Sequence, residues 1–130
     1  MGENYIYCRP PAGLNDSLVQ KDWCWRVAKR QKRILIIEDN TKTGGSFWPY
    51  FRPKPAFEGQ IVPHTDPSLP DLDSMTSVVP ASLIGRVSSF EIAYSNRRFW
   101  DATDTTVLLS FDPRKDAGAQ LLVHFQCGGG

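Results

Sequence analysis

Residues 5–38 follow a strand–loop–helix–strand order, which restricts the fold more than any other feature of the chain. Tyr5–Cys8 is a short aromatic and β-branched run that is typical of a strand. Ile34–Ile37 is continuously apolar, as expected of a strand buried on both faces of a sheet. Pro10 and Pro11 break the chain after the first run, and a helical stretch follows. Two strands joined through a helix within about 35 residues predict a parallel βαβ unit.

The helix between these strands is expected to begin at a capping box. In Ser17-Leu18-Val19-Gln20 the serine side chain can accept a hydrogen bond from the Gln20 N–H, and Asn15 and Asp16 are competing caps. The apolar residues that predict a core-facing stripe are Leu18, Val19, Trp23, Val27 and Ala28. The basic residues at the C-terminal end, where cations complement the helix dipole, are Lys29, Arg30, Lys32 and Arg33.

Residues 41–80 are rich in proline and aromatic residues and interrupt this pattern. Because proline donates no backbone N–H, we expect neither a long helix nor a central strand in this segment. Its prolines are Pro49, Pro53, Pro55, Pro63, Pro67, Pro70 and Pro80. Large aromatic side chains are costly to leave in water, so we interpret the segment as an ordered, irregular excursion packed on the sheet. A mobile loop is the alternative.

The last third returns to strand-like patterns. Residues 105–111 are rich in β-formers, residues 121–125 are continuously apolar, and residues 89–94 fit either a helix end or a short strand. A length of 130 residues accommodates one domain. The predicted fold class is therefore α/β, a single domain over residues 1–130. It contains a Rossmann-like partial parallel sheet, flanking helices and the proline-rich excursion.

Composition and charge exclude several classes of function. The formal net charge is +1, from 15 basic and 14 acidic residues, whereas proteins that bind nucleic acid through its phosphates carry a clear basic excess. No apolar run approaches the roughly 20 residues that span a bilayer, and the N-terminus lacks a signal-peptide pattern. Three cysteines without paired spacing indicate a reducing compartment. We therefore expect a cytoplasmic protein with no nucleic-acid partner and no membrane span.

The loop after the first strand is the strongest candidate for a binding site. It joins the carboxyl end of a strand to the N-terminus of a helix, where parallel sheets bind ligands and free N–H groups favour anions. The candidate ligand-binding residues are Arg9, Gly13, Leu14, Asn15 and Asp16. The arginine can fork onto a phosphate or carboxylate, and the glycine permits close approach. A purely structural interpretation competes with this one: the glycine makes the turn, Asn or Asp caps the helix, and the arginine is solvated.

The remaining chemistry-bearing residues point to structural roles. His124 lies among apolar residues and is interpreted as a hydrogen-bonded core histidine. Cys127 is interpreted as an inert thiol, because the other histidine, His64, lies in the proline-rich segment. The acidic residues interpreted as turn caps are Asp66, Asp71 and Asp73. Asp101 and Asp104, beside Arg97 and Arg98, fit either an ion pair or an edge that binds an acceptor. No metal-ligand spacing and no glycine-rich nucleotide fingerprint is present, so we expect no metal, no cofactor and no catalytic residue.

Several segments, taken in order, match the opening of a known group of enzymes. They are Tyr5-Ile6-Tyr7-Cys8-Arg9-Pro10, then Gly13-Leu14-Asn15-Asp16, then a helix with Cys24 and Trp25, then Arg33-Ile34-Leu35-Ile36-Ile37-Glu38-Asp39. This order resembles fucosyltransferase-like glycosyltransferases of the O-fucosyltransferase and nodulation-type alpha-1,6-fucosyltransferase group. The tail from Leu121 to Gly130 looks like a segment of uncharacterised bacterial proteins that share the opening.

The resemblance implies a nucleotide-sugar-dependent transferase with two facing α/β domains, a GDP-sugar donor and a glycan acceptor. Gly13, Leu14 and Asn15 would border the donor cleft. The chain departs from the group because the His-x-Arg-Arg-x-Asp-type donor motif is absent: neither His64 nor His124 is followed by the required arginine. We therefore expect an N-terminal domain or a truncated relative, inactive without a second domain or chain.

A non-catalytic α/β module that binds a nucleotide, a sugar phosphate or a protein partner is the alternative. The last apolar strand is not followed by a helix in the sequence, and an apolar sheet face or edge would then be left uncovered. We therefore also expect self-association.

Overall fold

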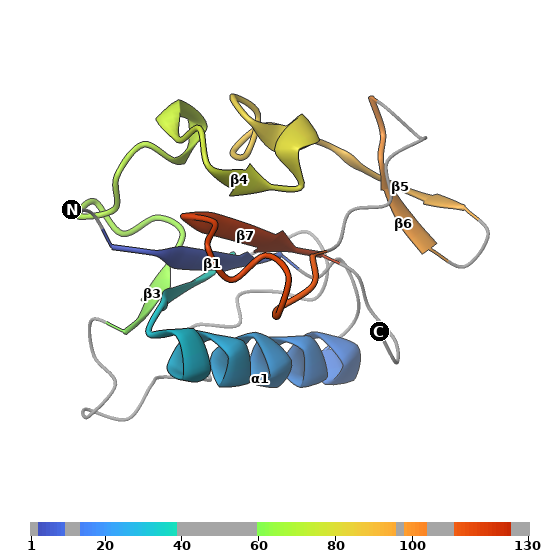
Figure 1. The fold of residues 1–130 in the computed structure, drawn as a ribbon. Coiled ribbons are helices and arrows are strands. Elements are labelled where there is room, and N and C mark those ends of the chain that lie inside the picture. The colour runs from blue at the N-terminus through green and yellow to red at the C-terminus, as the bar shows by residue number, and fades with distance from the viewer. Residues whose placement is uncertain (1–2, 10–13, 39–59, 96–97, 104–110, 126–130) are drawn as a thin grey trace.

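The computed structural model describes residues 3–9, 14–38, 60–95, 98–103 and 111–125. Its centre is a five-stranded sheet with a long helix across one face (Figure 1). The strands are β1 (Tyr5–Cys8), β2 (Ile34–Ile37), β3 (Ile61–Pro63), β4 (Val78–Val79) and β7 (Leu121–His124). They pair in the order β3-β2-β1-β7-β4, and every pairing is parallel. The predicted α/β class is therefore confirmed.

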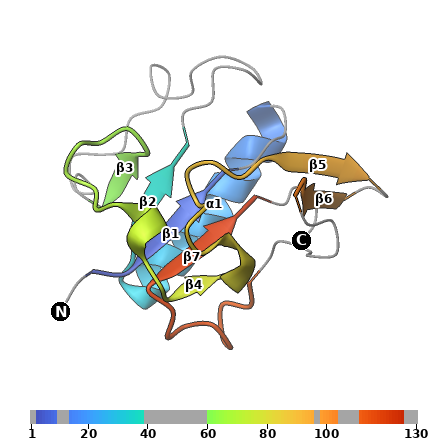
Figure 2. The same ribbon diagram turned by 90° about the horizontal axis from the view of Figure 1, so that it is seen from above.

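The other elements lie around this sheet (Figure 2). The helix α1 (Leu14–Gln31) connects β1 to β2, and the 3-10 helices η3 (Leu72–Ser74) and η4 (Ala81–Leu83) lie on the face opposite α1 (Figure 1). An antiparallel pair, β5 (Ile92–Ser95) and β6 (Arg98–Asp101), extends to one side. Of the strand predicted over residues 105–111, all but the last residue lies outside the described residues, as do residues 41–59 of the excursion.

The central position of β1 follows from its sequence. Tyr5 pairs with Ile34 of β2 on one side and with Leu121 of β7 on the other, and all four residues of β1 are buried. The predicted βαβ unit is therefore present, and the last apolar run lies beside the first strand.

The described part of the proline-rich segment supplies both edges of the sheet. Pro63 ends β3, and Pro80 follows β4 directly. An edge strand needs hydrogen-bond partners on one side only, so the missing N–H of proline is tolerated there. Residues 60–80 are thus partly built into the sheet, whereas the sequence predicted an irregular excursion on top of it.

The sheet carries an apolar cluster on each face. Beneath α1, the cluster contains Ile6, Cys8, Cys24, Val27, Ala28, Leu35, Ile37 and Leu122. On the opposite face, it contains Tyr5, Tyr7, Ile36, Val62, Met75, Val78, Leu83, Val87, Phe90, Leu121, Val123 and Phe125. Because residues 75–90 cover this second face, the expected uncovered apolar face is wrong for the part of the chain that the structure describes. Self-association gains no support from it.

Helix α1 differs from its prediction at its start and in its buried side. It begins at Leu14, so Ser17 lies inside the first turns and the capping box does not mark the N-terminus. Val19 is 63% exposed, whereas Gln20 and Cys24 are buried. Consecutive helical residues point about 100° apart, so burying Gln20 and Cys24 turns Val19 toward solvent.

The C-terminal end of α1 is closed by a turn that leads directly into β2. Lys32 has a φ of 56°, in the left-handed region, and the Arg33 N–H donates to the Ala28 carbonyl at 2.8 Å. This is the Schellman arrangement, in which a left-handed residue after the helix lets the next N–H reach back to a free carbonyl. The chain therefore reverses within two residues, and β2 begins at Ile34.

The Arg33 side chain ties this turn to the centre of the sheet. It is 3% exposed, and its Nη1 donates to the carbonyls of Tyr5 and Gln120 at 3.1 and 3.3 Å. Its Nη2 donates to the Ala117 carbonyl at 2.9 Å, and its Nε donates to Gln31 Oε1 at 2.6 Å. Burial lowers the pKa of Arg33 from its usual range. One guanidinium thus joins the end of α1 to β1 and to the turn that enters β7.

A second buried charge anchors the antiparallel pair. Asp101, at the end of β6, is fully buried and pairs with Arg86, which also donates to the Ser82 carbonyl at 3.0 Å. Asp101 further accepts from the Thr103 N–H at 3.0 Å. The sequence offered Arg97 or Arg98 as the ion-pair partner and did not single out Arg86, whereas Arg97 and Asp104 lie outside the described residues.

Replacing Arg33 should destabilise the protein more than replacing any exposed arginine of α1. Arg33→Met leaves the carbonyls of Tyr5, Ala117 and Gln120 without this donor, and we expect a loss of about 2–4 kcal/mol in unfolding free energy. The exposed Arg26, which pairs with Asp22 at 3.0 Å, gives the matched control Arg26→Met, with a loss below about 1 kcal/mol. Urea unfolding followed by circular dichroism measures both, and equal losses would contradict the role assigned to Arg33.

Candidate functional site

The candidate site lies at the carboxyl edge, the edge at which β1, β2, β3 and β7 end. The first residues after β1, β2 and β3 are Arg9, Glu38 and His64. Their N–H groups donate to carbonyls of the neighbouring strands, Arg9 to His124 at 2.7 Å, Glu38 to Cys8 at 3.0 Å and His64 to Ile37 at 2.9 Å. The three residues therefore stand in one row across adjacent strands, at the edge where parallel sheets bind ligands.

Arg9 is held in a fixed position within this row. Its Nε donates to Glu38 Oε2 at 2.6 Å, and its Nη1 donates to the Phe90 carbonyl at 2.7 Å. The guanidinium carbon also lies 4.5 Å from the centre of the Phe90 ring, a cation–π contact. The Arg9 and Glu38 side chains remain 21% and 16% exposed. The predicted binding arginine is therefore partly accessible, although much of its hydrogen-bonding capacity is used inside the protein.

Helix α1 begins at this same edge. Figure 1 shows it starting on the side toward which the arrowheads of β1 and β7 point. Leu14, Asn15 and Asp16 form the start of its first turn, whereas Gly13 lies outside the described residues and the side chains of the other three are not described. The N-terminus of an 18-residue helix carries a partial positive charge and free N–H groups. The backbone N–H groups of residues 14–16 thus lie at the helix N-terminus, where they can donate to an anion.

Tyr7 lies within β1, two residues before Arg9. It is 4% exposed, and burial raises the pKa of its phenol, with the charges of Glu38 and Asp73 adding to the effect and Arg9 opposing it. Asp73 itself accepts hydrogen bonds from the N–H, at 2.9 Å, and the hydroxyl of Ser88. The phenol therefore stays neutral near physiological pH.

The sequence missed Glu38 and Tyr7 as members of the site. Glu38 follows a buried parallel strand directly, and this position was itself a usable signal, because the residue after such a strand reaches the ligand-binding edge. Tyr7 gives no comparable signal, since a tyrosine in a short apolar strand reads as core.

The other predicted residues take structural roles where the structure describes them. His124 is buried, its Nε2 lies 2.7 Å from Gln20 Oε1, and its ring centre lies 4.9 Å from that of Trp23. The prediction of a hydrogen-bonded core histidine is confirmed, and Cys127 lies outside the described residues. Asp66 and Asp71 accept hydrogen bonds from N–H groups two residues ahead, as turn caps do. The thiols of Cys8 and Cys24 are buried, and burial raises the pKa of Cys24, so neither is suited to act as a nucleophile.

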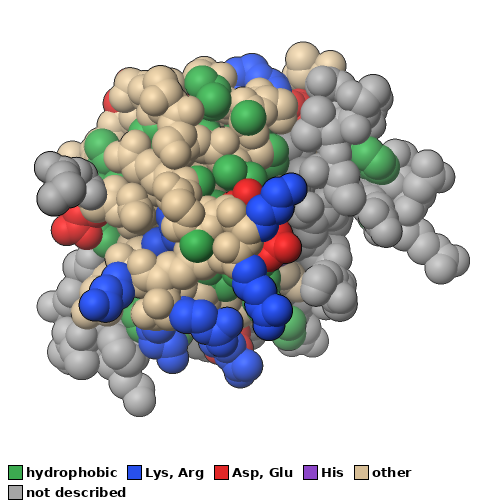
Figure 3. Space-filling model, viewed as in Figure 1, with side chains coloured by type: hydrophobic (Ala, Val, Ile, Leu, Met, Phe, Trp, Pro, Cys, Tyr) green, Lys and Arg blue, Asp and Glu red, His purple; other side chains and the backbone are tan. Residues whose placement is uncertain are grey.

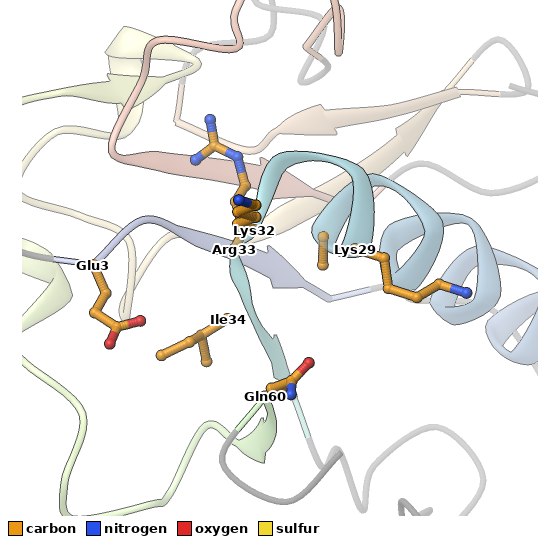
Figure 4. Close-up of a pocket in the computed structure, with 7 residues that line it drawn as sticks. Glu3, Lys29, Lys32, Arg33, Ile34 and Gln60 are labelled. Atoms are coloured by element: carbon orange, nitrogen blue, oxygen red, sulfur yellow. The ribbon is translucent and has the colours of Figure 1, made fainter. Parts of the chain in front are cut away.

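A hollow at the opposite, amino-terminal edge is a weaker candidate (Figure 4). Its volume is about 430 Å³, and Glu3, Lys29, Lys32, Arg33 and Gln60 are among the residues that line it. Lysine and arginine side chains also gather on the surface around α1 (Figure 3). However, the Arg33 guanidinium is bound by carbonyls, and the Lys29 ammonium lies 5.5 Å from the centre of the Trp25 ring. Of the three cationic side chains that line the hollow, those of Lys29 and Arg33 therefore already interact with other groups of the protein.

Tyr7 should make the stability of the protein depend on pH in the alkaline range. A tyrosine in the unfolded chain ionises near pH 10, whereas the raised pKa keeps the folded phenol neutral. Stability is therefore complete below about pH 10 and falls above it, by up to about 1.4 kcal/mol per pH unit. Urea unfolding across this range should show a smaller alkaline loss for Tyr7→Phe than for the wild type. Tyr94→Phe, at a residue 63% exposed, is the control and should behave like the wild type; equal losses in all three would contradict the assignment.

Two further observations concern the described residues as a whole. None of their helices is both long and apolar enough to cross a membrane, and no group of three His, Cys, Asp or Glu side chains among them could hold a metal ion.

Comparisons with protein families, with curated proteins and with solved structures find no match to this chain.

Proposed function

We propose that this chain binds the diphosphate of a nucleotide or nucleotide sugar at the carboxyl edge. In this proposal it is the N-terminal domain, or a truncated relative, of a fucosyltransferase-like glycosyltransferase, and the start of α1 borders the donor cleft. The observation that carries the proposal is that α1 starts at the carboxyl edge of the sheet, the same edge at which a partly exposed and already oriented arginine follows β1.

The chemistry of this edge favours a phosphate-bearing ligand. The free N–H groups in the first turn of α1 can donate to phosphate oxygens, and the partial positive charge of the helix favours an anion. Arg9 adds a guanidinium donor whose direction is set by Glu38 and Phe90. These features are suited to the diphosphate of GDP or a GDP-sugar.

Sugar transfer would use the same features. As the bond between sugar and diphosphate breaks, negative charge develops on the departing phosphate, and oriented donors stabilise that charge. The reaction also needs a glycan acceptor held in line with the donor. We propose that a second domain or chain completes the cleft, so the 130-residue chain alone binds without turnover.

Calorimetric titration of the purified chain with GDP and GDP-fucose tests the proposal. Asn15→Ala should weaken binding by about threefold to tenfold, because it removes the polar side chain of a residue predicted to bind the ligand. Arg9→Lys keeps the charge but loses the guanidinium fork, and it should weaken binding by at least as much. Arg26→Ala, on the exposed side of α1, is the matched control and should leave the affinity unchanged. Absence of heat with either ligand, from chain shown to be folded by circular dichroism, would contradict the proposal.

A further inference from the structure

We infer that the Arg9–Glu38 ion pair selects ligands in which a sugar hydroxyl lies beside a phosphate. Glu38 would accept a hydrogen bond from the hydroxyl through Oε1, and Arg9 would donate to the phosphate through Nη2. This inference rests on the proposed function and specifies the ligand class for the same site.

The first support is the set of atoms that the pair leaves unused. Its hydrogen bonds engage Nε and Nη1 of Arg9 and Oε2 of Glu38. Within the described residues, neither Nη2 of Arg9 nor Oε1 of Glu38 has a hydrogen-bond partner. Both side chains are partly exposed, so the pair holds one unused donor and one unused acceptor at a partly accessible position.

The second support is the rigidity of the pair. Exposed ion pairs contribute little because two long side chains must be ordered to form them. Here the Phe90 carbonyl and ring hold the guanidinium, and the backbones of both residues are bonded to neighbouring strands. A ligand would meet a donor and an acceptor whose directions are already set, which reduces the entropic cost of binding.

The third support is the charge balance of the pair. A bare phosphate is attracted by Arg9 but repelled by Glu38, so the pair as a whole gives it little advantage. A hydroxyl donates to a carboxylate, and a sugar phosphate therefore satisfies both ends of the pair. Glu38 also follows β2 directly, next to the strand that leads to α1, and an acidic residue in this region can bind ribose hydroxyls in dinucleotide-binding sheets.

The hydroxyl can come from the ribose of the nucleotide or from the transferred sugar, and ligand analogues distinguish the two. Calorimetric titrations would compare GDP, 2′,3′-dideoxy-GDP, fucose 1-phosphate and pyrophosphate. We expect Glu38→Gln to weaken binding of GDP or of fucose 1-phosphate by about tenfold while leaving pyrophosphate binding equal or tighter. Weaker binding of the dideoxy analogue to the wild type identifies the ribose as the source. Asp22→Asn, at an exposed carboxylate of α1, is the matched control and should have no effect.

The ligand comparison decides the question even where Glu38→Gln fails to fold, because it uses the wild-type chain. The inference is overturned where GDP and its dideoxy analogue bind the wild type equally and fucose 1-phosphate binds no better than pyrophosphate. The proposed function survives that result, since GDP still binds. Absence of GDP and GDP-fucose binding would instead remove the proposed function and this inference together.

Discussion

The buried guanidinium of Arg33 holds the centre of the fold together. It joins the end of α1 to the first residue of β1 and to the turn that leads into β7, through carbonyl oxygens spread over more than a hundred residues of chain. These contacts lie at the amino-terminal edge of the sheet, where β1, β2 and β7 all begin. The parallel strands β1 and β2 are paired in register from their first residue to their last. The contacts that fix where they begin therefore also place Arg9 and Glu38 side by side at the carboxyl edge. The candidate site therefore depends on an interaction at the opposite end of the strands.

Sequence patterns predict the parts of this fold that depend on local repetition of apolar residues. The two continuous apolar runs beginning at Ile34 and Leu121 identify the strands on either side of β1, because a strand buried on both faces cannot alternate polar and apolar residues. The edge strands β3 and β4 escape prediction, since each is short and borders a proline. The start of α1 is missed for a different reason: Asn15, Asp16 and Ser17 are all good caps, yet the helix begins at Leu14, before any of them.

Contacts between distant residues explain what could not be predicted about the site. Arg9 stands out in the sequence because it follows a strand and precedes a loop, but its partners Glu38 and Phe90 lie 29 and 81 residues away. No local spacing links them. The same holds for Arg86, which follows η4, and Asp101, the last residue of β6, which lie 15 residues apart. His124 could be interpreted correctly because its apolar neighbours in the strand already indicate burial, and Gln20 supplies the hydrogen bond that a buried imidazole needs.

The central claim is that a diphosphate binds where α1 begins. Amide chemical shifts of the ¹⁵N-labelled chain, recorded during titration with GDP, test it most directly, because each amide reports on its own surroundings. The account predicts that the largest changes occur at Arg9 and in the first turn of α1, at residues 14–17, with little change at Lys32 and Gln60 in the amino-terminal hollow. Changes centred on that hollow, or none at the start of α1 at saturating GDP, would contradict it.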